Sequence, residues 1–483
     1  MPHPQLLHGP YAAPAGRRLL LLSHHFPPGQ GTGALRWQKL AALAAERGWG
    51  VDAVTAHPDD LTSTDPARFA ELPAGTRVFG VRAGSSPVAA LRHARTAISR
   101  SLRGMRSAAD SRDARRRDAS TAGEVVSDLI YRADLRRGMG PRAAVRAWRA
   151  WRYFARDAAW ARAAGRAASF IAEAGTHRAL VTCGPPHMVH LAGAEAAARA
   201  GIPFVMDLRD AWSIVPAVPA GMASPLWYAL AERYEARAVR AASLVVANTP
   251  ALRDAMAAAH PRSADRMVAV MNGCDDEPLP LAERDGRFVI AYAGNIYIDR
   301  DPRPLFAAVA RLAAGAGLGP DRLGIELVGH VDAFGGVPVA ELARRECAAA
   351  FLTVHPRLPR AQALWLLGRA SVLVSLPQDV DLAIPSKLFE YMQMPAWVLA
   401  LARDSSSTAQ LLRGTAADVV DPADVDAIHA ALLARWRQFA AGETPRPINA
   451  DGRFGRRAQA AVLFDALERV AGTPVSPGAW RAA

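Results

Sequence analysis

Residues 18–55 read RLLLLSHHFPPGQGTGALRWQKLAALAAERGWGVDAVT, and this stretch decides the fold class. An apolar run, Arg18 to Ser23, is followed by a loop with three glycines, a helical pattern from Ala34 to Arg47, and a second apolar run from Val51 to Thr55. Strand, glycine loop, helix and strand in this order predict a βαβ unit, whose two strands lie parallel in one sheet.

The same alternation of strand-like and helix-like segments recurs along the rest of the chain. Short apolar runs bounded by turn residues predict buried strands, and segments with apolar residues three and four apart predict helices. The expected strands are residues 179–182, 203–208, 244–248, 288–293, 324–328, 371–375 and 397–401, and the expected helices are 188–200, 225–241, 304–314, 360–369, 386–392 and about 453–470.

The chain is expected to form two domains. A chain of 483 residues usually exceeds what one hydrophobic core can hold. Asp275 to Arg287 is charged, contains proline and interrupts the alternation, which is typical of a linker. We therefore expect an α/β protein with parallel sheets in two similar halves, 1–280 and 281–483, and a last helix that packs back toward the N-terminal half.

Composition excludes several classes of protein. Because 51% of the residues are hydrophobic and 21% charged, the chain is not globally disordered. Three distant cysteines (Cys183, Cys274 and Cys347) exclude a disulfide scaffold and a C-x-x-C metal site. No apolar run reaches the roughly 18–20 residues of a membrane-spanning helix. We therefore expect a cytoplasmic protein whose membrane contact is at most peripheral, at the inner face of the plasma membrane.

The net charge of +13 is largely due to an Arg-rich region, about 88–166, which we expect to be an insertion in the N-terminal half. One interpretation is a solvated helical insertion, and the other is a basic surface with aromatic anchors that lies on an anionic membrane leaflet. No nucleic-acid motif accompanies the region, so we expect no nucleic-acid partner. Its aromatic residues include Trp148, Trp151, Tyr153, Phe154 and Trp160.

Lysine is rare in this chain, and one of its two lysines occupies an unusual position. Of 58 basic residues only Lys39 and Lys387 are lysines. Lys387 lies in the first turn of an expected helix, where a cation opposes the helix dipole, and Glu390 follows on the same face. This arrangement predicts a phosphate clamp with a carboxylate nearby that accepts sugar hydroxyl groups. The alternative is an ordinary surface ion pair.

Other candidate residues follow predicted strands. Gly29, Gly31 and Gly33 precede a helix, where backbone N–H groups attract anions, although a tight turn is the alternative. The segment 207–212 (DLRDAW) ends a strand, where ligands bind in open α/β sheets. Its charged residues either orient sugar hydroxyl groups or form a structural Asp–Arg pair. These charged residues are Asp207, Arg209 and Asp210.

Three histidines, His24, His25 and His187, are expected at the same sheet edge as these residues. None has metal-ligand spacing, and the G-x-S-x-G signature of hydrolases is absent, so we expect neither a metal site nor a hydrolase triad. For His187 two interpretations remain open, a core or loop residue and a base on the acceptor side.

Together these segments resemble the GT-B glycosyltransferases of the large family-4-like group, which use sugar nucleotides and include enzymes of bacterial surface-polysaccharide synthesis. The segments occur in the family's order over about residues 18–470, with the Arg-rich region outside the match. They are 23–33 (SHHFPPGQGTG), 184–187 (GPPH), 207–212 (DLRDAW), 245–249 (VVANT), 292–295 (YAGN) and 384–391 (IPSKLFEY).

The resemblance implies two Rossmann-like domains whose parallel sheets face each other across a cleft. Residues 1–280 would bind the acceptor and residues 281–483 the nucleotide sugar. Arg300 and Lys387 match the positive residues that neutralise the leaving diphosphate, and Glu390 matches the second glutamate of the family's E-x7-E motif.

The remaining site residues of the family are only partly matched. Gly31 and Gly33 match the loop that closes over the phosphates, and Gly294 and Asn295 belong to a donor-binding segment. The position of the first glutamate of E-x7-E is occupied by Leu382, with Asp381 adjacent. The sugar contacts that this glutamate makes in the family are therefore not expected from residue 382. The family's histidine after the strand at 203–208 is replaced by Arg209 or Asp210, so a catalytic base at this place is either a carboxylate or absent.

We therefore predict a glycosyltransferase of class EC 2.4 that moves a sugar from a nucleotide-sugar donor to a lipid-linked or polysaccharide acceptor. The resemblance implies retention of configuration, because retaining members of the family react on one face of the sugar without a protein nucleophile. Independence of metal and cofactor is expected, because arginine and lysine can stabilise the leaving diphosphate. The predicted catalytic residues are Asp207, Arg209, Asp210, Arg300 and Lys387. The alternative function is a non-catalytic sugar- or nucleotide-binding subunit of a glycan assembly complex.

Overall fold

The computed structural model describes residues 4–83, 129–137, 142–173, 175–275, 279, 286–297, 300–376 and 381–471. Residues 88–128 of the predicted insertion, and residues 276–278 and 280–285 of the predicted linker, lie outside these ranges.

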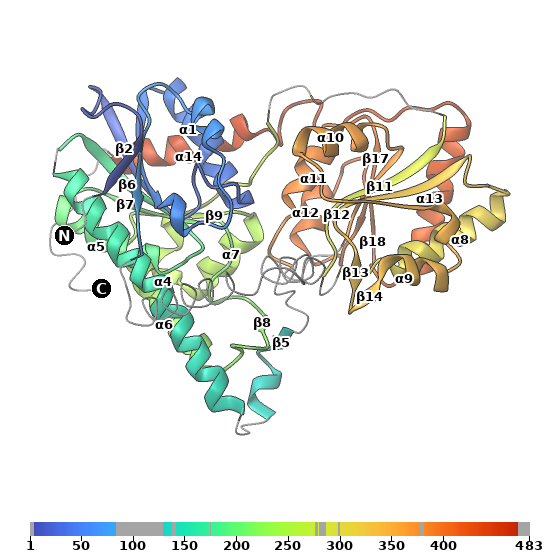
Figure 1. Cartoon of the computed structure of the whole chain (residues 1–483), viewed down its shortest axis with the longest axis horizontal. Coiled ribbons are helices and arrows are strands. Elements are labelled where there is room, and N and C mark those ends of the chain that lie inside the picture. The colour runs from blue at the N-terminus through green and yellow to red at the C-terminus, as the bar shows by residue number, and fades with distance from the viewer. Residues whose placement is uncertain are drawn as a thin grey trace, which may run out of the picture. The chain divides into compact units, whose positions relative to one another are not determined.

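The chain divides by its internal contacts into two compact units, each with its own sheet (Figure 1). Unit 1 consists of Met1–Ala247, Ala255–Val268 and Val462–Ala483, and unit 2 of Asn248–Asp254 and Ala269–Ala461. The expected fold class, α/β with parallel sheets in two domains, is confirmed. Two helices, α7 (Pro250–Ala259) and α14 (Arg456–Ala471), have residues in both units.

The described sheet of unit 1 has eight strands in the order β1-β4-β3-β2-β6-β7-β9-β10. The neighbours from β4 to β9 pair in parallel, whereas β1 pairs antiparallel with β4 at one edge. The strands are β1 (Gln5–His8), β2 (Arg17–Ser23), β3 (Trp49–Ala56), β4 (Arg77–Val81), β6 (His177–Gly184), β7 (Phe204–Leu208), β9 (Leu244–Ala247) and β10 (Met267–Ala269), and a separate antiparallel pair is formed by β5 (Leu129–Tyr131) and β8 (Ala217–Pro219).

The helices of unit 1 cover this sheet. α4 and α5 pack against each other and against the central strands, and α1 packs against β3. The helices are α1 (Thr32–Glu46), α4 (Arg142–Ala172), α5 (Val189–Ala200) and α6 (Pro225–Ala241), with short 3₁₀ helices η1 (Pro58–Asp60), η2 (Pro66–Glu71), η3 (Asp134–Arg137) and η4 (Pro261–Arg266).

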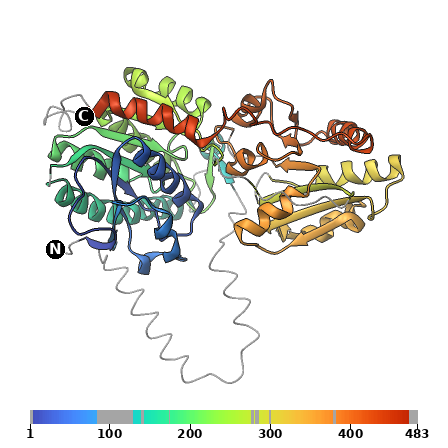
Figure 2. The ribbon, with the colours of Figure 1, turned by 90° about the horizontal axis from the view of Figure 1, so that it is seen from above.

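The C-terminal part of the last helix, α14, lies along unit 1 and is drawn in red in Figure 2. Its carboxylates Asp465 and Glu468 form ion pairs with Arg47, at the end of α1, and with Arg17, at the start of β2. Arg17 also stacks on Trp49, with its guanidinium 4.5 Å from the ring centroid. The contacts therefore tie α14 to the amino-terminal ends of β2 and β3.

The interpretation of residues 150–166 as part of an insertion is wrong. From Ala150 onward α4 presents one continuous apolar face to the sheet and to α5, and Phe154 and Trp160 are each only 4% exposed. The density of arginines hid this pattern, because the arginines occupy the opposite side of the same helix. Phe154 and Trp160 are thus core residues rather than surface anchors, whereas Trp148 and Trp151 are exposed.

The described sheet of unit 2 has six parallel strands in the order β15-β12-β11-β16-β17-β18. The strands are β11 (Phe288–Asn295), β12 (Leu323–His330), β15 (Leu352–His355), β16 (Val372–Ser375), β17 (Trp397–Leu401) and β18 (Asp418–Val420), with a small antiparallel pair β13 (Ala333–Phe334) and β14 (Val337–Pro338). The helices are α8 (Arg303–Ala316), α9 (Val339–Arg345), α10 (Arg360–Gly368), α11 (Ser386–Tyr391), α12 (Ser407–Leu412) and α13 (Val425–Ala440), with the 3₁₀ helix η5 (Ala349–Phe351).

Both faces of this sheet are buried, which explains why β11 is apolar at nearly every position. Phe288, Ile290 and Tyr292 join the core beneath α8 and α13, while Val289 and Ala291 join the core beneath α10 and α11. A parallel sheet covered on both sides requires such continuous apolar runs. Because helices cover both faces of the sheet, polar side chains are concentrated in the loops that follow the strands at its carboxyl edge.

Candidate functional site

The carboxyl ends of β2, β6 and β7 meet at one edge of the unit 1 sheet. The register pairs Ser23 with Cys183 and Cys183 with Asp207 across these three adjacent parallel strands. The residues that follow each strand therefore emerge at the same edge. This confirms the prediction that the three histidines and the 207–212 segment share it.

His24 and His25 lie beside each other at the end of β2, with ring centroids 4.8 Å apart. The His24 ring is also 4.8 Å from the ring of Trp160 on α4. Burial lowers the pKa of His24 to about 4, and the charges of Arg156 and Arg209 add to this effect. Burial and the neighbouring His24 lower the pKa of His25 to about 4 as well. Both imidazoles are thus neutral near pH 7.

His187 is a buried residue rather than an exposed base. Its ring stacks on Trp212 with centroids 5.1 Å apart and lies 5.8 Å from His190. Burial, together with the fields of His190 and Arg209, holds the pKa of His187 well below its usual range. His190, whose Nδ1 lies 2.7 Å from the Thr182 hydroxyl, is likewise neutral, because burial lowers its pKa to about 3. The geometry favours the core interpretation of His187.

Asp207 was predicted as a catalytic residue, whereas its surroundings favour the alternative, a structural role. Its side chain is fully buried and accepts two hydrogen bonds from Arg36, at 2.9 and 3.0 Å, and one of 2.7 Å from the Trp37 indole. Arg36 and Trp37 belong to α1, so this carboxylate fastens α1 to the end of β7. A structural Asp–Arg pair does exist here, but its arginine is Arg36 and not Arg209.

Arg209 and Asp210 remain candidates for contact with a substrate. Asp210 is exposed and lies 3.5 Å from Arg209, measured from Oδ2 to Nε. Arg209 packs over the glycine loop: a Cβ placed on Gly33 would lie 1.8 Å from its Nη1. A side chain at residue 33 would therefore displace Arg209. Gly31 is the N-cap of α1.

Sequence reasoning missed Asp157, a second carboxylate close to this edge. It lies on α4 one turn before Trp160, is 7% exposed and accepts a hydrogen bond from the Tyr153 hydroxyl. Burial raises its pKa to about 6, although Arg156, with Nε 3.7 Å away, opposes the shift. The signal that would have found it is the lone acidic residue in an Arg-rich helix.

In unit 2, the end of β11 brings Gly294, Asn295 and Arg300 together. Arg300 Nη1 donates to the Asn295 carbonyl at 3.1 Å, and its guanidinium lies 4.5 Å from the ring centroid of Tyr297. The Tyr292 hydroxyl donates to the same carbonyl at 2.9 Å. A Cβ on Gly294 would lie 2.5 Å from this hydroxyl, so a side chain at residue 294 would displace the Tyr292 ring.

The short helix α11 is fixed to the end of β11 by Tyr391. Its buried hydroxyl accepts a hydrogen bond of 2.9 Å from the backbone N–H of Ala293. One turn earlier on α11, Lys387 Nζ donates to Glu390 Oε2 at 3.0 Å. Lys387 and Glu390 therefore form the i,i+3 ion pair that was the alternative to a phosphate clamp, and the pair lies beside the carboxyl end of the sheet.

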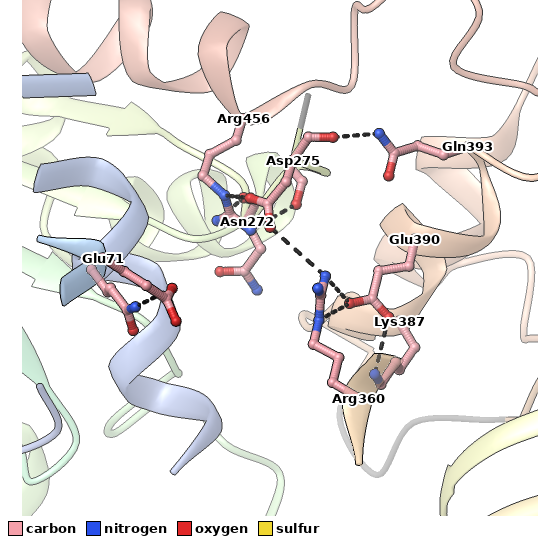
Figure 3. A network of polar contacts seen from close by, with 10 residues as sticks. Glu71, Asn272, Asp275, Arg360, Lys387, Glu390, Gln393 and Arg456 are labelled. Atoms are coloured by element: carbon pink, nitrogen blue, oxygen red, sulfur yellow. Dashed lines mark hydrogen bonds and ion pairs between the residues drawn. The ribbon is translucent and has the colours of Figure 1, made fainter. Parts of the chain in front are cut away.

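A second cation at Glu390 was not predicted. Arg360, the first residue of α10, donates to Glu390 Oε1 from Nη2 at 2.9 Å and from Nε at 3.2 Å (Figure 3). Glu390, with only 13% of its side chain exposed, thus lies between Lys387 and Arg360. Like Lys387, Arg360 is a cation in the first turn of a helix, so the same signal marked it in the sequence.

The charge network continues from Arg360 to Asp275 and Arg456. Arg360 Nη2 is 3.8 Å from Asp275, and Arg456 Nε donates to Asp275 Oδ1 at 2.6 Å (Figure 3). Among the described residues, three cations thus enclose two carboxylates, which gives this set of side chains one positive charge in excess. An anion that binds near Lys387 and Arg360 meets this excess charge.

The position of the family's first glutamate carries no carboxylate here. It is occupied by Leu382, and the neighbouring Asp381 is paired with Arg403, which donates to Oδ1 at 2.8 and 3.2 Å. Within the described ranges, no group of three or more His, Cys, Asp or Glu side chains is arranged to hold a metal ion. Nor does any helix in those ranges combine the length and the apolar character needed to cross a membrane.

Solved structures share this fold over nearly the whole chain. Sucrose-phosphate synthase from Thermosynechococcus elongatus matches 94% of this chain and 98% of its own, with a TM-score of 0.57 and 13% identity. HepE from Anabaena, in complex with UDP and glucose, matches 94% and 100%, with a TM-score of 0.54 and 14% identity. The lipopolysaccharide outer core galactosyltransferase WaaB matches 94% and 99%, with a TM-score of 0.51 and 11% identity. No protein-family model and no curated protein matches the sequence.

The chain therefore has the GT-B fold of glycosyltransferases, as the sequence predicted. Membership of the family-4-like group within that fold stays a prediction.

Proposed function

We propose that this protein is a glycosyltransferase that transfers a sugar from a nucleotide-sugar donor to a lipid-linked or polysaccharide acceptor in the synthesis of a cell-surface glycan. The GT-B fold supports the activity. HepE was solved with UDP and with UDP-glucose, which supports a nucleotide sugar as the donor. WaaB is a lipopolysaccharide galactosyltransferase, which supports a surface glycan as the acceptor.

The observation that carries the proposal is the placement of Lys387 and Arg360 on either side of Glu390 at the carboxyl edge of the unit 2 sheet. Lysine has three N–H donors, and within the described ranges Lys387 uses one of them, for Glu390, so a diphosphate could accept from the others. Charge-assisted bonds to phosphate are among the stronger hydrogen bonds in proteins. Once a diphosphate occupies the cations, Glu390 can accept hydroxyl groups of the ribose or sugar.

In the proposed reaction the acceptor oxygen forms a bond to the anomeric carbon while the bond from that carbon to the diphosphate oxygen breaks. The diphosphate leaves with the electron pair, and Lys387 and Arg300 stabilise its charge without a metal. The acceptor proton passes to the departing phosphate oxygen on the same face of the sugar. This route retains the configuration and needs no protein nucleophile.

The acceptor is assigned to unit 1. His24, Arg209 and Asp210 lie at the carboxyl edge of its sheet, where ligands of α/β proteins bind. Because both histidines at the end of β2 are neutral near pH 7, they can accept a hydrogen bond from a sugar hydroxyl group. The enzyme would act in the cytoplasm, on acceptors at the inner face of the membrane.

Replacement of Lys387 tests the donor site. Isothermal titration with UDP and with other nucleoside diphosphates is compared for the wild type, Lys387→Ala and Arg345→Ala. Loss of a charge-assisted bond is expected to weaken binding about 10- to 150-fold in Lys387→Ala. Arg345→Ala is the matched control, because Arg345 pairs with Glu341 at 2.9 Å on α9, and its binding should not change.

If Lys387→Ala binds nucleoside diphosphates with unchanged affinity, Lys387 is not part of a phosphate clamp. Binding without transfer or hydrolysis of any nucleotide sugar would favour the alternative, a non-catalytic binding subunit. The pairing of Asp381 with Arg403, which leaves no carboxylate in the place of the first glutamate, is the observation behind that alternative.

A further inference from the structure

The first four turns of α4 carry an exposed surface that the fold of unit 1 does not use. Figure 1 shows this end of α4 extending beyond the sheet of unit 1, next to β5 and β8. We call this surface the α4 ridge, and its residues are Val145, Trp148, Arg149, Trp151, Arg152 and Arg156.

The α4 ridge combines apolar and basic side chains in two adjacent stripes. Trp148 and Trp151 are 53% and 56% exposed, although tryptophan is usually well buried. Helical geometry puts these two rings on one side and Arg149, Arg152 and Arg156 on the neighbouring side. The Arg152 guanidinium lies 4.5 Å from the centroid of a Trp148 ring, which keeps the two stripes in contact.

Charge determines which partner suits the α4 ridge. Residues 142–156 contain five arginines and no acidic residue. The other Arg-rich stretch of this chain, 92–117, has nine arginines against two aspartates, and a second copy would present the same basic surface. Repulsion between like charges therefore disfavours both residues 92–117 and a second copy of the chain as partners of the α4 ridge. An anionic surface with an apolar interior fits both stripes, since tryptophan and arginine favour the interface between lipid headgroups and acyl chains.

The same helix connects the α4 ridge to the acceptor-side residues of unit 1. Trp160, which contacts His24, follows Trp151 by nine residues on one continuous helix. At 1.5 Å per residue this separation is about 13 Å. Because α4 is packed into the core from Ala150 onward, the spacing between the two tryptophans is fixed.

We propose that the α4 ridge docks on an anionic lipid bilayer and thereby keeps the His24 edge of unit 1 close to the membrane surface. This inference rests on the proposed function, because it specifies the acceptor as a glycan carried by a membrane lipid. It narrows the contact surface to six residues of α4.

Co-sedimentation with vesicles tests the proposal, with the full chain and vesicles of pure phosphatidylcholine or of phosphatidylcholine with 30 mol % phosphatidylglycerol as stated probes. The wild type is expected to bind the anionic vesicles and to lose binding in high salt. Trp148→Ser/Trp151→Ser should lose at least tenfold in affinity. Arg149→Gln/Arg152→Gln should lose about 30-fold, from about fivefold per arginine near the surface.

The chain offers a matched control for the tryptophans. Trp365 in unit 2 is 49% exposed, and the guanidinium of Arg369 lies 5.2 Å from its ring centroid. Trp365→Ser should bind vesicles as the wild type does, and so should Arg344→Gln/Arg345→Gln on α9. Unfolding curves for each variant confirm that the exposed substitutions leave the fold intact.

Two results would overturn the proposal. One is undiminished vesicle binding in the α4 ridge variants, which would assign any membrane contact to another part of the chain. The other is binding of single-stranded RNA that competes with the vesicles and depends on the same tryptophans, which would make the α4 ridge a nucleic-acid surface. Titration with UDP in the absence of vesicles reports on the donor site separately, so failure of either proposal can be recognised independently.

Discussion

Replacing Asp207 distinguishes a structural carboxylate from a catalytic one. The substitution Asp207→Asn keeps the size of the side chain and an oxygen that can accept from the Trp37 indole. It removes the negative charge that faces Arg36, whose side chain is 2% exposed. Arg36 is then left buried with a neutral amide in the place of its counterion.

The expected cost follows from this burial. Removing one partner of a buried ion pair usually destabilises a protein by about 3–5 kcal/mol, because the remaining charge has lost its compensation. For a domain of this size each kcal/mol lowers the melting temperature by about 2–4 °C. Asp207→Asn should therefore lower the melting temperature of unit 1 by roughly 6–20 °C.

Thermal unfolding and UDP titration are measured on the same samples. The matched control is Asp210→Asn, three residues further along the chain, where the carboxylate is exposed and the melting temperature should change little. Arg36→Met/Asp207→Leu replaces the whole pair with apolar groups and should recover most of the lost stability. UDP binding, assigned to unit 2, should be the same in all variants that remain folded.

One outcome would refute this reasoning. If Asp207→Asn melts within about 1 °C of the wild type and yet abolishes transfer, the carboxylate acts in the chemistry rather than in fastening α1.

Two further predictions concern stability. Tyr391→Phe should destabilise unit 2 by about 1–3 kcal/mol in urea unfolding, because the buried N–H of Ala293 loses its acceptor. Tyr11→Phe, whose side chain is 93% exposed, serves as the comparison, and equal losses would argue against the anchor. Unit 1 should show opposing pH effects. The lowered pKa of His24 and His25 supplies stability above about pH 6.5 that is lost as pH falls through about 4. The raised pKa of Asp157 supplies stability below about pH 4 that is lost as pH rises through about 6. Asp157→Asn should therefore make unit 1 more stable at pH 7 but not at pH 4, and identical curves for variant and wild type would contradict the burial of that charge.

Much of the fold could be predicted because its signals are local. The helix at 225–241 and the strand at 397–401 have the predicted bounds. Ser224 accepts a hydrogen bond of 3.2 Å from the Trp227 N–H and Pro225 opens the helix, so short-range chemistry sets where it begins. A parallel strand buried on both faces is likewise visible as an apolar run.

What could not be predicted depends on partners far away in the sequence. Asp207 was expected near Arg209, two residues on, but it pairs with Arg36, which comes from α1. Phe154 and Trp160 were assigned to a surface insertion because arginines surround them in the sequence. Their burial depends on a sheet whose strands come from other parts of the chain. Arg360 meets Glu390 only because α10 and α11 follow strands that end at the same edge of the sheet.

The membership of α14 in both units has a consequence for how this protein is made. Unit 1 is not encoded as one continuous stretch, because Asp465 and Glu468 reach it only after the whole of unit 2 has left the ribosome. At the usual 5–20 residues per second, the roughly 200 residues in between take about 10–40 s to synthesise. During that interval α14 does not yet cover the surface around Trp49 and Arg17, so chaperones can bind this surface. For the same reason, a fragment ending at residue 268 would isolate an unfinished domain, and exchange of whole domains between relatives would have to carry the last helix along with the first 268 residues.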